Sequence, residues 1–115
     1  MLYIKEEDVG KLLPMSVALE AVEEVLRLHG QGKAVNITRS RVRLPNNVLH
    51  VMSGGVPDLN ITGLKAYTTT RQGARFVVLL YQADTGEFLA MIEADKLGQI
   101  RTGATSGVAT RYMAR

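Results

Sequence analysis

Three arginines alternate along one short segment of the chain, VNITRSRVRL. Side chains of a β-strand point alternately to its two faces, so Arg39, Arg41 and Arg43 are predicted to project from one side, about 7 Å apart. Two interpretations remain open. The arginines form a charged, solvated edge that resists aggregation, or at least one of them binds a carboxylate in the bidentate manner of a guanidinium.

A lysine stands among small and hydroxyl-bearing residues in the segment GLKAYTTT. In one interpretation Lys65 is a surface residue whose aliphatic stem lies along the strand. In the other its side chain is enclosed, burial lowers its pKa, and a partner anion is needed to keep the amine charged. Lys65 is then a candidate for holding a substrate carboxylate or for polarising a carbonyl.

The last segment, LGQIRTGATSGVATRYMAR, predicts a helix with an apolar stripe and a face of small hydroxyl groups. The stripe contains Leu97, Ile100, Ala104, Val108 and Tyr112, and the hydroxyl face contains Thr102, Thr105, Ser106 and Thr110. Gly103 and Gly107 each cost about 0.5–1 kcal/mol relative to alanine inside a helix. Another helix or a ligand is therefore expected to approach them closely.

Other segments predict the elements that position these residues. A strand over residues 2–4 and a turn of helix over 6–13 come first. Pro14 suits the first position of a longer helix that continues to His29. The apolar face of that helix is predicted to consist of Ala18, Val22, Val25, Leu26 and His29.

The middle of the chain predicts strands. Residues 35–44 and 48–52 flank a turn at Pro45-Asn46-Asn47, and the third, fourth and fifth runs cover 62–70, 74–81 and 87–94. Gly86 is expected to adopt a positive φ between the last two. Those two strands are apolar on both sides, so both of their faces are expected to be covered, by helices or by another subunit. The prediction is one α+β domain over residues 1–115, with a mostly antiparallel sheet and flanking helices in two layers.

Composition narrows the possible functions. The chain has 115 residues, 46% of them hydrophobic, and a net charge of +3 whose basic residues are interspersed with acidic ones, which argues against nucleic-acid binding. No apolar run approaches the roughly 20 residues of a membrane span, and the N-terminus does not resemble a signal peptide. A soluble, cytoplasmic protein is expected. Cysteine is absent, and neither His29 nor His50 has carboxylates at metal-ligand spacing, so no metal site is predicted.

Three segments together resemble the ornithine cyclodeaminase/mu-crystallin family: RSRVRLPNNVLHVM, GLKAYTTT and LLYQADTGEFLAMIEADKLGQIRTGATSGVATRYMAR. The resemblance spans essentially all 115 residues and concerns the family's N-terminal half. It implies a homodimeric enzyme that uses NAD or NADP and acts on small amino acids or cyclic imino acids. The Rossmann domain of such an enzyme is absent from this chain, which has no G-x-G-x-x-G motif. The chain alone is therefore expected to be inactive and not to bind the cofactor tightly.

The resemblance also implies roles for single residues. Arg39 matches the arginine that holds the substrate carboxylate, with Arg41 as the alternative because the hairpin length leaves the match uncertain by two positions. Lys65 matches a lysine that contacts the same carboxylate. Arg101 matches a residue at the meeting point of substrate and cofactor, and Thr102 begins the face toward the nicotinamide nucleotide. Free N–H groups at a helix start beside a guanidinium form a reasonable anion site.

The sequence departs from the family pattern at two places. It has Gly73-Ala74-Arg75 where relatives often have Pro-Thr, and Gln82 where many have aspartate. A cofactor contact and the substrate preference are expected to differ accordingly. Two other functions remain open: a non-catalytic oligomerisation or binding module whose strands pair with a second copy, and an anion or nucleic-acid binder that uses the arginine strand.

Overall fold

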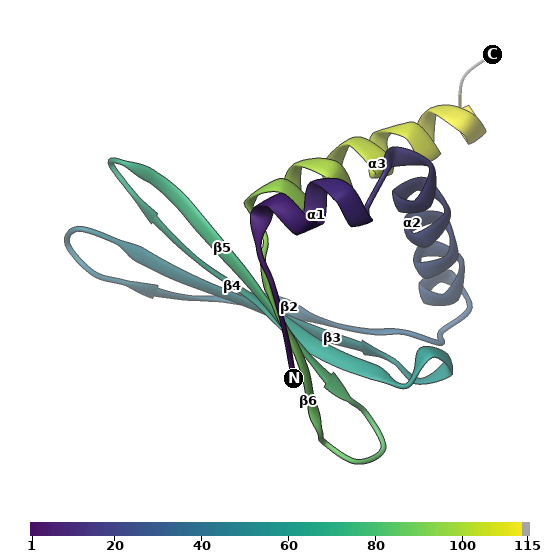
Figure 1. The fold of residues 1–115 in the computed structure, drawn as a ribbon, viewed down its shortest axis with the longest axis horizontal. Helices are drawn as coiled ribbons and strands as arrows, with labels where there is room; N and C mark the ends of the chain where they lie inside the picture. Colours follow the sequence, from purple (N-terminus) through teal and green to yellow (C-terminus); the bar gives the residue numbers. More distant parts are fainter. Residues whose placement is uncertain (114–115) are drawn as a thin grey trace.

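A six-stranded sheet and three α-helices make up the fold in the computed structural model, which describes residues 1–113 (Figure 1). The strands lie in the order β1-β6-β5-β4-β3-β2. β1 (Leu2–Ile4) pairs in parallel with β6 (Phe88–Glu93), and all the other neighbouring strands pair antiparallel. The predicted α+β fold with a mostly antiparallel sheet is confirmed.

Four long strands form most of the sheet, with β2 at its edge: β2 (Val35–Arg43), β3 (Val48–Val56), β4 (Ile61–Thr70) and β5 (Gly73–Gln82). β3 is longer than predicted because its pairing with β4 continues through two glycines, which carry no side-chain pattern. A short 3-10 helix, η1 (Pro57–Leu59), follows β3. Gly86 has φ +75°, as expected for the turn between β5 and β6.

A β-bulge interrupts the pairing of β2 with β3. Ile37 lies opposite Ser53, but Ser40 lies opposite Val51, so β2 contains one extra residue between these pairs. Beyond the bulge Arg41 is opposite His50. Bulges redirect side chains locally, and Arg39 lies within this one.

All three helices lie on one side of the sheet (Figure 1). They are α1 (Glu6–Leu12), α2 (Met15–Gly30) and α3 (Asp95–Met113). Pro14 is the N-cap of α2 with extended backbone, one position earlier than predicted. A Cβ at Gly107 would lie 2.7 Å from Leu19 Cδ2, and one at Gly103 would lie 3.3 Å from Met15 Cε. The two glycines of α3 therefore allow close approach of α2, not of a ligand.

The predicted apolar stripes are only partly buried. Ala104 and Val108 of α3 are buried, but Tyr112 is 71% exposed and donates its hydroxyl to Glu23. On α2, Ala18 is buried, whereas two further members of the predicted face, Val25 and Leu26, are exposed. The reason is that α2 packs mainly against α3 and stands away from the sheet.

The opposite face of the sheet carries no helix. Its centre is formed by half-exposed apolar side chains of four strands: Val51, Leu64, Ala66, Val77, Leu79 and Met91. We call this surface the open sheet face. Among the described residues no helix covers this face of β5 and β6, and cover by another subunit stays a prediction.

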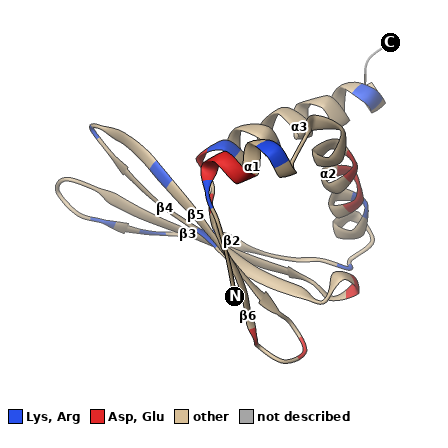
Figure 2. Ribbon diagram, viewed as in Figure 1, with Lys and Arg blue, Asp and Glu red and all other residues tan. Residues whose placement is uncertain are grey.

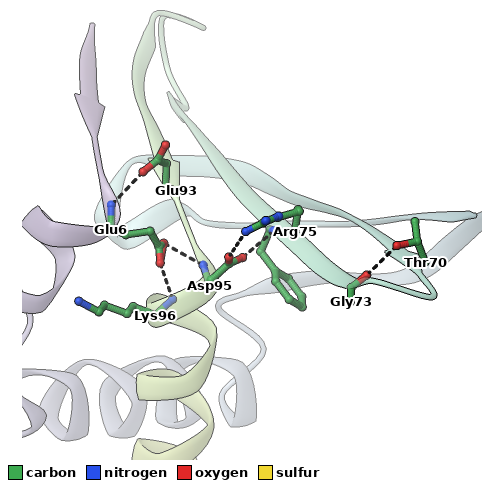
Figure 3. Close-up of polar contacts among 8 residues, drawn as sticks. Glu6, Thr70, Gly73, Arg75, Glu93, Asp95 and Lys96 are labelled. Carbon is green, nitrogen blue, oxygen red and sulfur yellow. Dashed lines mark hydrogen bonds and ion pairs between the residues drawn. The ribbon is translucent and has the colours of Figure 1, made fainter.

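Glu6 attaches the start of α3 to the start of α1 (Figure 3). Its carboxylate accepts hydrogen bonds from the backbone N–H groups of Asp95 and Lys96, both at 2.9 Å. These N–H groups have no partner inside the helix. The Glu6 backbone N–H in turn donates a hydrogen bond to the Glu93 carboxylate at 3.0 Å. Glu6 therefore joins the start of α1 both to the end of β6 and to the start of α3.

Replacing Glu6 with alanine is expected to lower the free energy of unfolding by about 1–2 kcal/mol, the usual cost of losing a helix cap. Urea denaturation monitored by circular dichroism measures this change. Glu7→Ala is the matched control, because Glu7 is an exposed acid of the same helical turn for which no such contact is found. Equal loss of stability in both variants would contradict the capping role.

Candidate functional site

Three aromatic rings form a stacked row across the helix-covered face of the sheet. His50 on β3 stacks on Tyr67 of β4, with ring centroids 4.3 Å apart and planes 5° apart. Tyr67 stacks in turn on Phe76 of β5 at 4.6 Å. The strand register produces this row, because His50 pairs with Tyr67 and Tyr67 pairs with Phe76.

Two cations lie over the aromatic row. The Arg39 guanidinium carbon is 5.8 Å from the centroid of the Tyr67 ring, and Lys65 Nζ is 5.5 Å from the same centroid. Lys65 Nζ also lies 5.7 Å from the centroid of Phe76. At these distances the negative faces of the rings attract the cations. Arg39 of β2 and Lys65 of β4 are therefore neighbours despite the strand between them.

Helix α3 closes one side of this arrangement. Lys65, Phe76, Arg101 and Thr102 line a hollow of about 640 Å³ between the sheet and the first turns of α3. Arg101 also borders a second hollow of about 520 Å³, which is mainly apolar and lies between α2 and the paired ends of β2 and β3. The half-exposed face of α2 lines that second hollow.

The cations of the site affect one another. The pKa of Lys65 is lowered, first by burial and then by the positive charges of Arg101 and Arg39. Lys65 therefore lies near both arginines: it shares the hollow with Arg101 and the ring of Tyr67 with Arg39. Arg41, the alternative to Arg39, lies opposite His50 on β2.

No acidic side chain of the described residues pairs with these cations. Within residues 1–113 the ion pairs are Arg27–Glu24, Arg75–Asp95 and Arg111–Glu23. Figure 2 shows basic residues on the hairpins β2–β3 and β4–β5. Acidic residues lie on α1, on α2 and toward the ends of the strands far from the tips of these hairpins. An unpaired group of cations beside a hollow attracts an anionic ligand.

His50 was considered in the sequence only as a metal ligand, and its position in the site was missed. Its side chain is buried, with 8% of its surface exposed. Nε2 lies 3.2 Å from Thr69 Oγ1, while Nδ1 has no hydrogen-bond partner. The register of β3 against β4, which brings His50 onto Tyr67, cannot be read from either strand alone. Among the described residues no group of three or more histidine, aspartate or glutamate side chains could hold a metal ion.

The pKa of His50 predicts how stability depends on pH. Burial lowers it from 6.5, and Arg41, Arg39 and Arg43 lower it further. The unfolded chain therefore binds a proton at a higher pH than the folded chain, and stability is lost as the pH falls below about 6.5.

His50→Phe keeps an aromatic ring in the stack and removes the titrating group. The wild type is expected to lose more stability than His50→Phe between about pH 8 and pH 5.5, a range above the titration of ordinary carboxylates. Thermal unfolding of both proteins at several pH values measures the difference. Parallel curves for the two proteins would show that His50 does not couple folding to pH.

The hydroxyl of Thr102 is partly engaged within its own helix. Thr102 Oγ1 donates a hydrogen bond to the Gly98 carbonyl at 2.8 Å and keeps its lone pairs as acceptors. Thr102 and Arg101 are both exposed on α3. The sequence holds no glycine-rich loop that could bind the phosphates of a dinucleotide.

Comparison with known proteins agrees with this fold. The chain matches the model of the ornithine cyclodeaminase/mu-crystallin family over residues 2–115. It belongs to that family. No described helix has the length and apolar character required to cross a membrane.

Individual relatives cover the whole of this chain. A Delta(1)-pyrroline-2-carboxylate reductase of Bacillus cereus is 30% identical over 100% of the chain and 38% of the reductase. The structure of an archaeal alanine dehydrogenase dimer with bound NAD superposes with a TM-score of 0.93 at 29% identity, covering 100% of this chain and 38% of the dehydrogenase. The structure of the Thermococcus litoralis Delta(1)-pyrroline-2-carboxylate reductase, in complex with NADH and L-proline, superposes with a TM-score of 0.92 at 29% identity. The match covers 100% of this chain and 38% of the reductase. The chain thus spans less than two fifths of the length of these relatives.

Proposed function

We propose that this chain supplies the carboxylate-binding part of an NAD- or NADP-dependent enzyme that acts on a small amino acid or cyclic imino acid. Arg39, Lys65 and Arg101 bind the carboxylate of the substrate. Arg101 and Thr102 contact the cofactor. The observation that carries the proposal is a group of three cations, from two strands and a helix, that have no acidic partner among residues 1–113: Lys65 and Arg101 line one hollow, and Arg39 lies with Lys65 over the Tyr67 ring.

The arrangement suits the binding of a small acid. A guanidinium binds a carboxylate through two parallel hydrogen bonds, and the lysine adds a compact charge whose lowered pKa an anion would raise. The rings of Tyr67 and Phe76 exclude water from one side, which strengthens the attraction. Fixing the carboxylate orients the α-carbon, and orientation is a large part of catalysis in such sites.

The cofactor supplies the hydride chemistry in the complete enzyme. The residues of this chain bind and orient the acid, and their positive charge stabilises negative charge on the substrate during the reaction. A protein of these residues alone is proposed to bind the acid without turning it over.

Binding of L-alanine and L-proline to the ¹⁵N-labelled chain tests the proposal. Saturable chemical-shift changes are expected at residues of the hollow, such as Lys65, Phe76 and Arg101, and only weak changes with NAD alone. L-alaninamide, which lacks the carboxylate, is the matched control and should produce no such changes. Equal responses to L-alanine and L-alaninamide, or no response to either acid, would overturn the proposal.

We also propose that two copies associate through the open sheet face. Six half-exposed apolar side chains occupy its centre, whereas Arg75 and Glu93 lie toward its edge. An apolar centre within a polar rim is typical of a protein–protein interface. A structure of one relative is described as a dimer.

Sedimentation equilibrium of the chain and of a Leu64→Lys variant tests the association. The wild type is expected to form a dimer and the variant to remain a monomer, because a buried lysine without a partner is unfavourable. Arg75→Lys, a change at the edge that keeps the charge, is the control. A monomeric wild type at all concentrations would contradict the proposed interface.

A further inference from the structure

The acidic and basic side chains of the two long hairpins, β2–β3 and β4–β5, are all basic. Residues 35–56 and 61–82 contain no aspartate or glutamate. Their basic residues are Arg39, Arg41, Arg43, Lys65, Arg71 and Arg75. All the acidic residues of the chain lie outside these two hairpins (Figure 2).

One carboxylate does not account for the cations on the helix-covered face. Lys65 and Arg101 line the hollow, and Arg39 lies over the Tyr67 ring, as Lys65 does. Arg41 comes two residues after Arg39 on β2, directly opposite His50. The positive charge of Arg41 is the largest electrostatic influence on His50, ahead of Arg39 and Arg43. Like charges at neighbouring positions repel. A second anionic group at this position would relieve that repulsion.

The unpaired nitrogen of His50 points to the same conclusion independently. His50 is more than nine-tenths buried, and its Nδ1 has no hydrogen-bond partner. Leaving a buried polar atom unpaired costs about 1–3 kcal/mol, so such atoms are rare in native proteins and often belong to functional sites. Thr69 can donate its hydroxyl hydrogen to Nε2, which places the proton of the neutral ring on Nδ1 and makes Nδ1 a donor.

The register places this donor close to the first carboxylate position. His50 pairs with Tyr67, and Lys65 lies two residues before Tyr67 on β4, on the same face. Diagonal neighbours on adjacent antiparallel strands are about 7–8 Å apart. The long side chains of Arg41 and Lys65 can both reach a small ligand that lies across Tyr67.

We propose that the substrate carries two acidic groups: one carboxylate binds to Arg39, Lys65 and Arg101, and a second binds to Arg41 and to Nδ1 of His50. The ligand is thus an amino or imino dicarboxylic acid. This inference rests on the proposed function and specifies the class of acid.

L-aspartate and L-asparagine test the second acidic group, because they have nearly the same size and differ in that charge. Titration of the chain at constant ionic strength is expected to show L-aspartate binding about tenfold or more tightly, the effect of one charged hydrogen-bonded pair. Arg41→Gln should abolish this preference. His50→Phe, which keeps the ring stack, should reduce the preference as well.

Arg43→Gln is the matched control for Arg41→Gln. It removes the same charge from the same face of β2, nearer the turn and opposite Val48. The preference for L-aspartate should survive this change. Loss of the preference to the same degree in both variants would show a general charge effect and overturn the inference.

ADP serves as a probe for the alternative that these cations bind phosphate groups of a dinucleotide. Competition of ADP with L-aspartate that Arg41→Gln removes would assign Arg41 to phosphate and overturn the inference. Equal binding of L-aspartate and L-asparagine would overturn it while leaving the proposed function intact. Failure of both amino acids to bind would overturn the proposed function and this inference together.

Discussion

Replacing Lys65 with methionine is expected to weaken the binding of L-alanine by about 10- to 100-fold, the loss of a charged hydrogen bond of about 1.5–3 kcal/mol. Methionine has a similar length and an apolar stem, so packing over Tyr67 and Phe76 should persist. The variant therefore tests the charge and not the fold. Isothermal titration calorimetry or the chemical-shift titration measures the affinity.

The pH dependence gives this variant a second readout. Because the pKa of Lys65 is lowered by burial and by two arginines, the amine loses its proton below the ordinary value of 10.5. Affinity of the wild type for L-alanine should fall as the pH rises through that lowered pKa, and Lys65→Met should lack this part of the decline. Lys11→Met, at an exposed lysine of α1, is the control and should bind as the wild type does. Unchanged affinity of Lys65→Met would remove Lys65 from the site.

Replacing Gly63 with alanine is expected to lower the free energy of unfolding by about 1–3 kcal/mol, the usual cost of overpacking. A Cβ at this position of β4 would lie 2.5 Å from the backbone oxygen of Leu79 and 3.0 Å from Leu80 Cδ2. The Leu80 side chain can move, but the oxygen of Leu79 belongs to β5, whose pairing with β4 would have to shift.

Gly98→Ala is the matched control for Gly63→Ala. Gly98 lies in α3, and a Cβ added there would meet no atom within 4 Å. Alanine there should raise stability by about 0.5–1 kcal/mol, because glycine is unfavourable inside a helix. Urea denaturation separates the two variants. A Gly63→Ala protein as stable as the wild type would show that the strands adjust without cost.

The kinds of secondary structure were predictable because local patterns determine them. Alternating apolar residues indicated the long strands, and the turn at Gly86 followed from a residue that tolerates positive φ. Errors arose where the pattern is silent or ambiguous. The end of β3 was not predicted, because its glycines carry no alternating side-chain pattern. The apolar spacing of α2 predicted a buried face, but in the structure this face lines a hollow.

The candidate site was predicted in part. Arg39, Lys65 and Arg101 were selected from residue types and from the family resemblance, and their binding roles remain predictions. Their proximity is a property of the strand register and of the place where α3 crosses the sheet. His50 was missed for the same reason, since its importance depends on its stack with Tyr67 and not on its neighbours in the sequence.

The amino-acid sequence by itself determined the fold class, the family and the excess of positive charge on residues 35–56 and 61–82, because these depend on composition and on short-range patterns. Only the tertiary structure decided which charges lie close together, that the glycines of α3 contact α2, and that one sheet face carries no helix of the described residues. The physical reason is that strand register and helix packing depend on contacts between residues far apart in the chain, whose free energy no local segment contains.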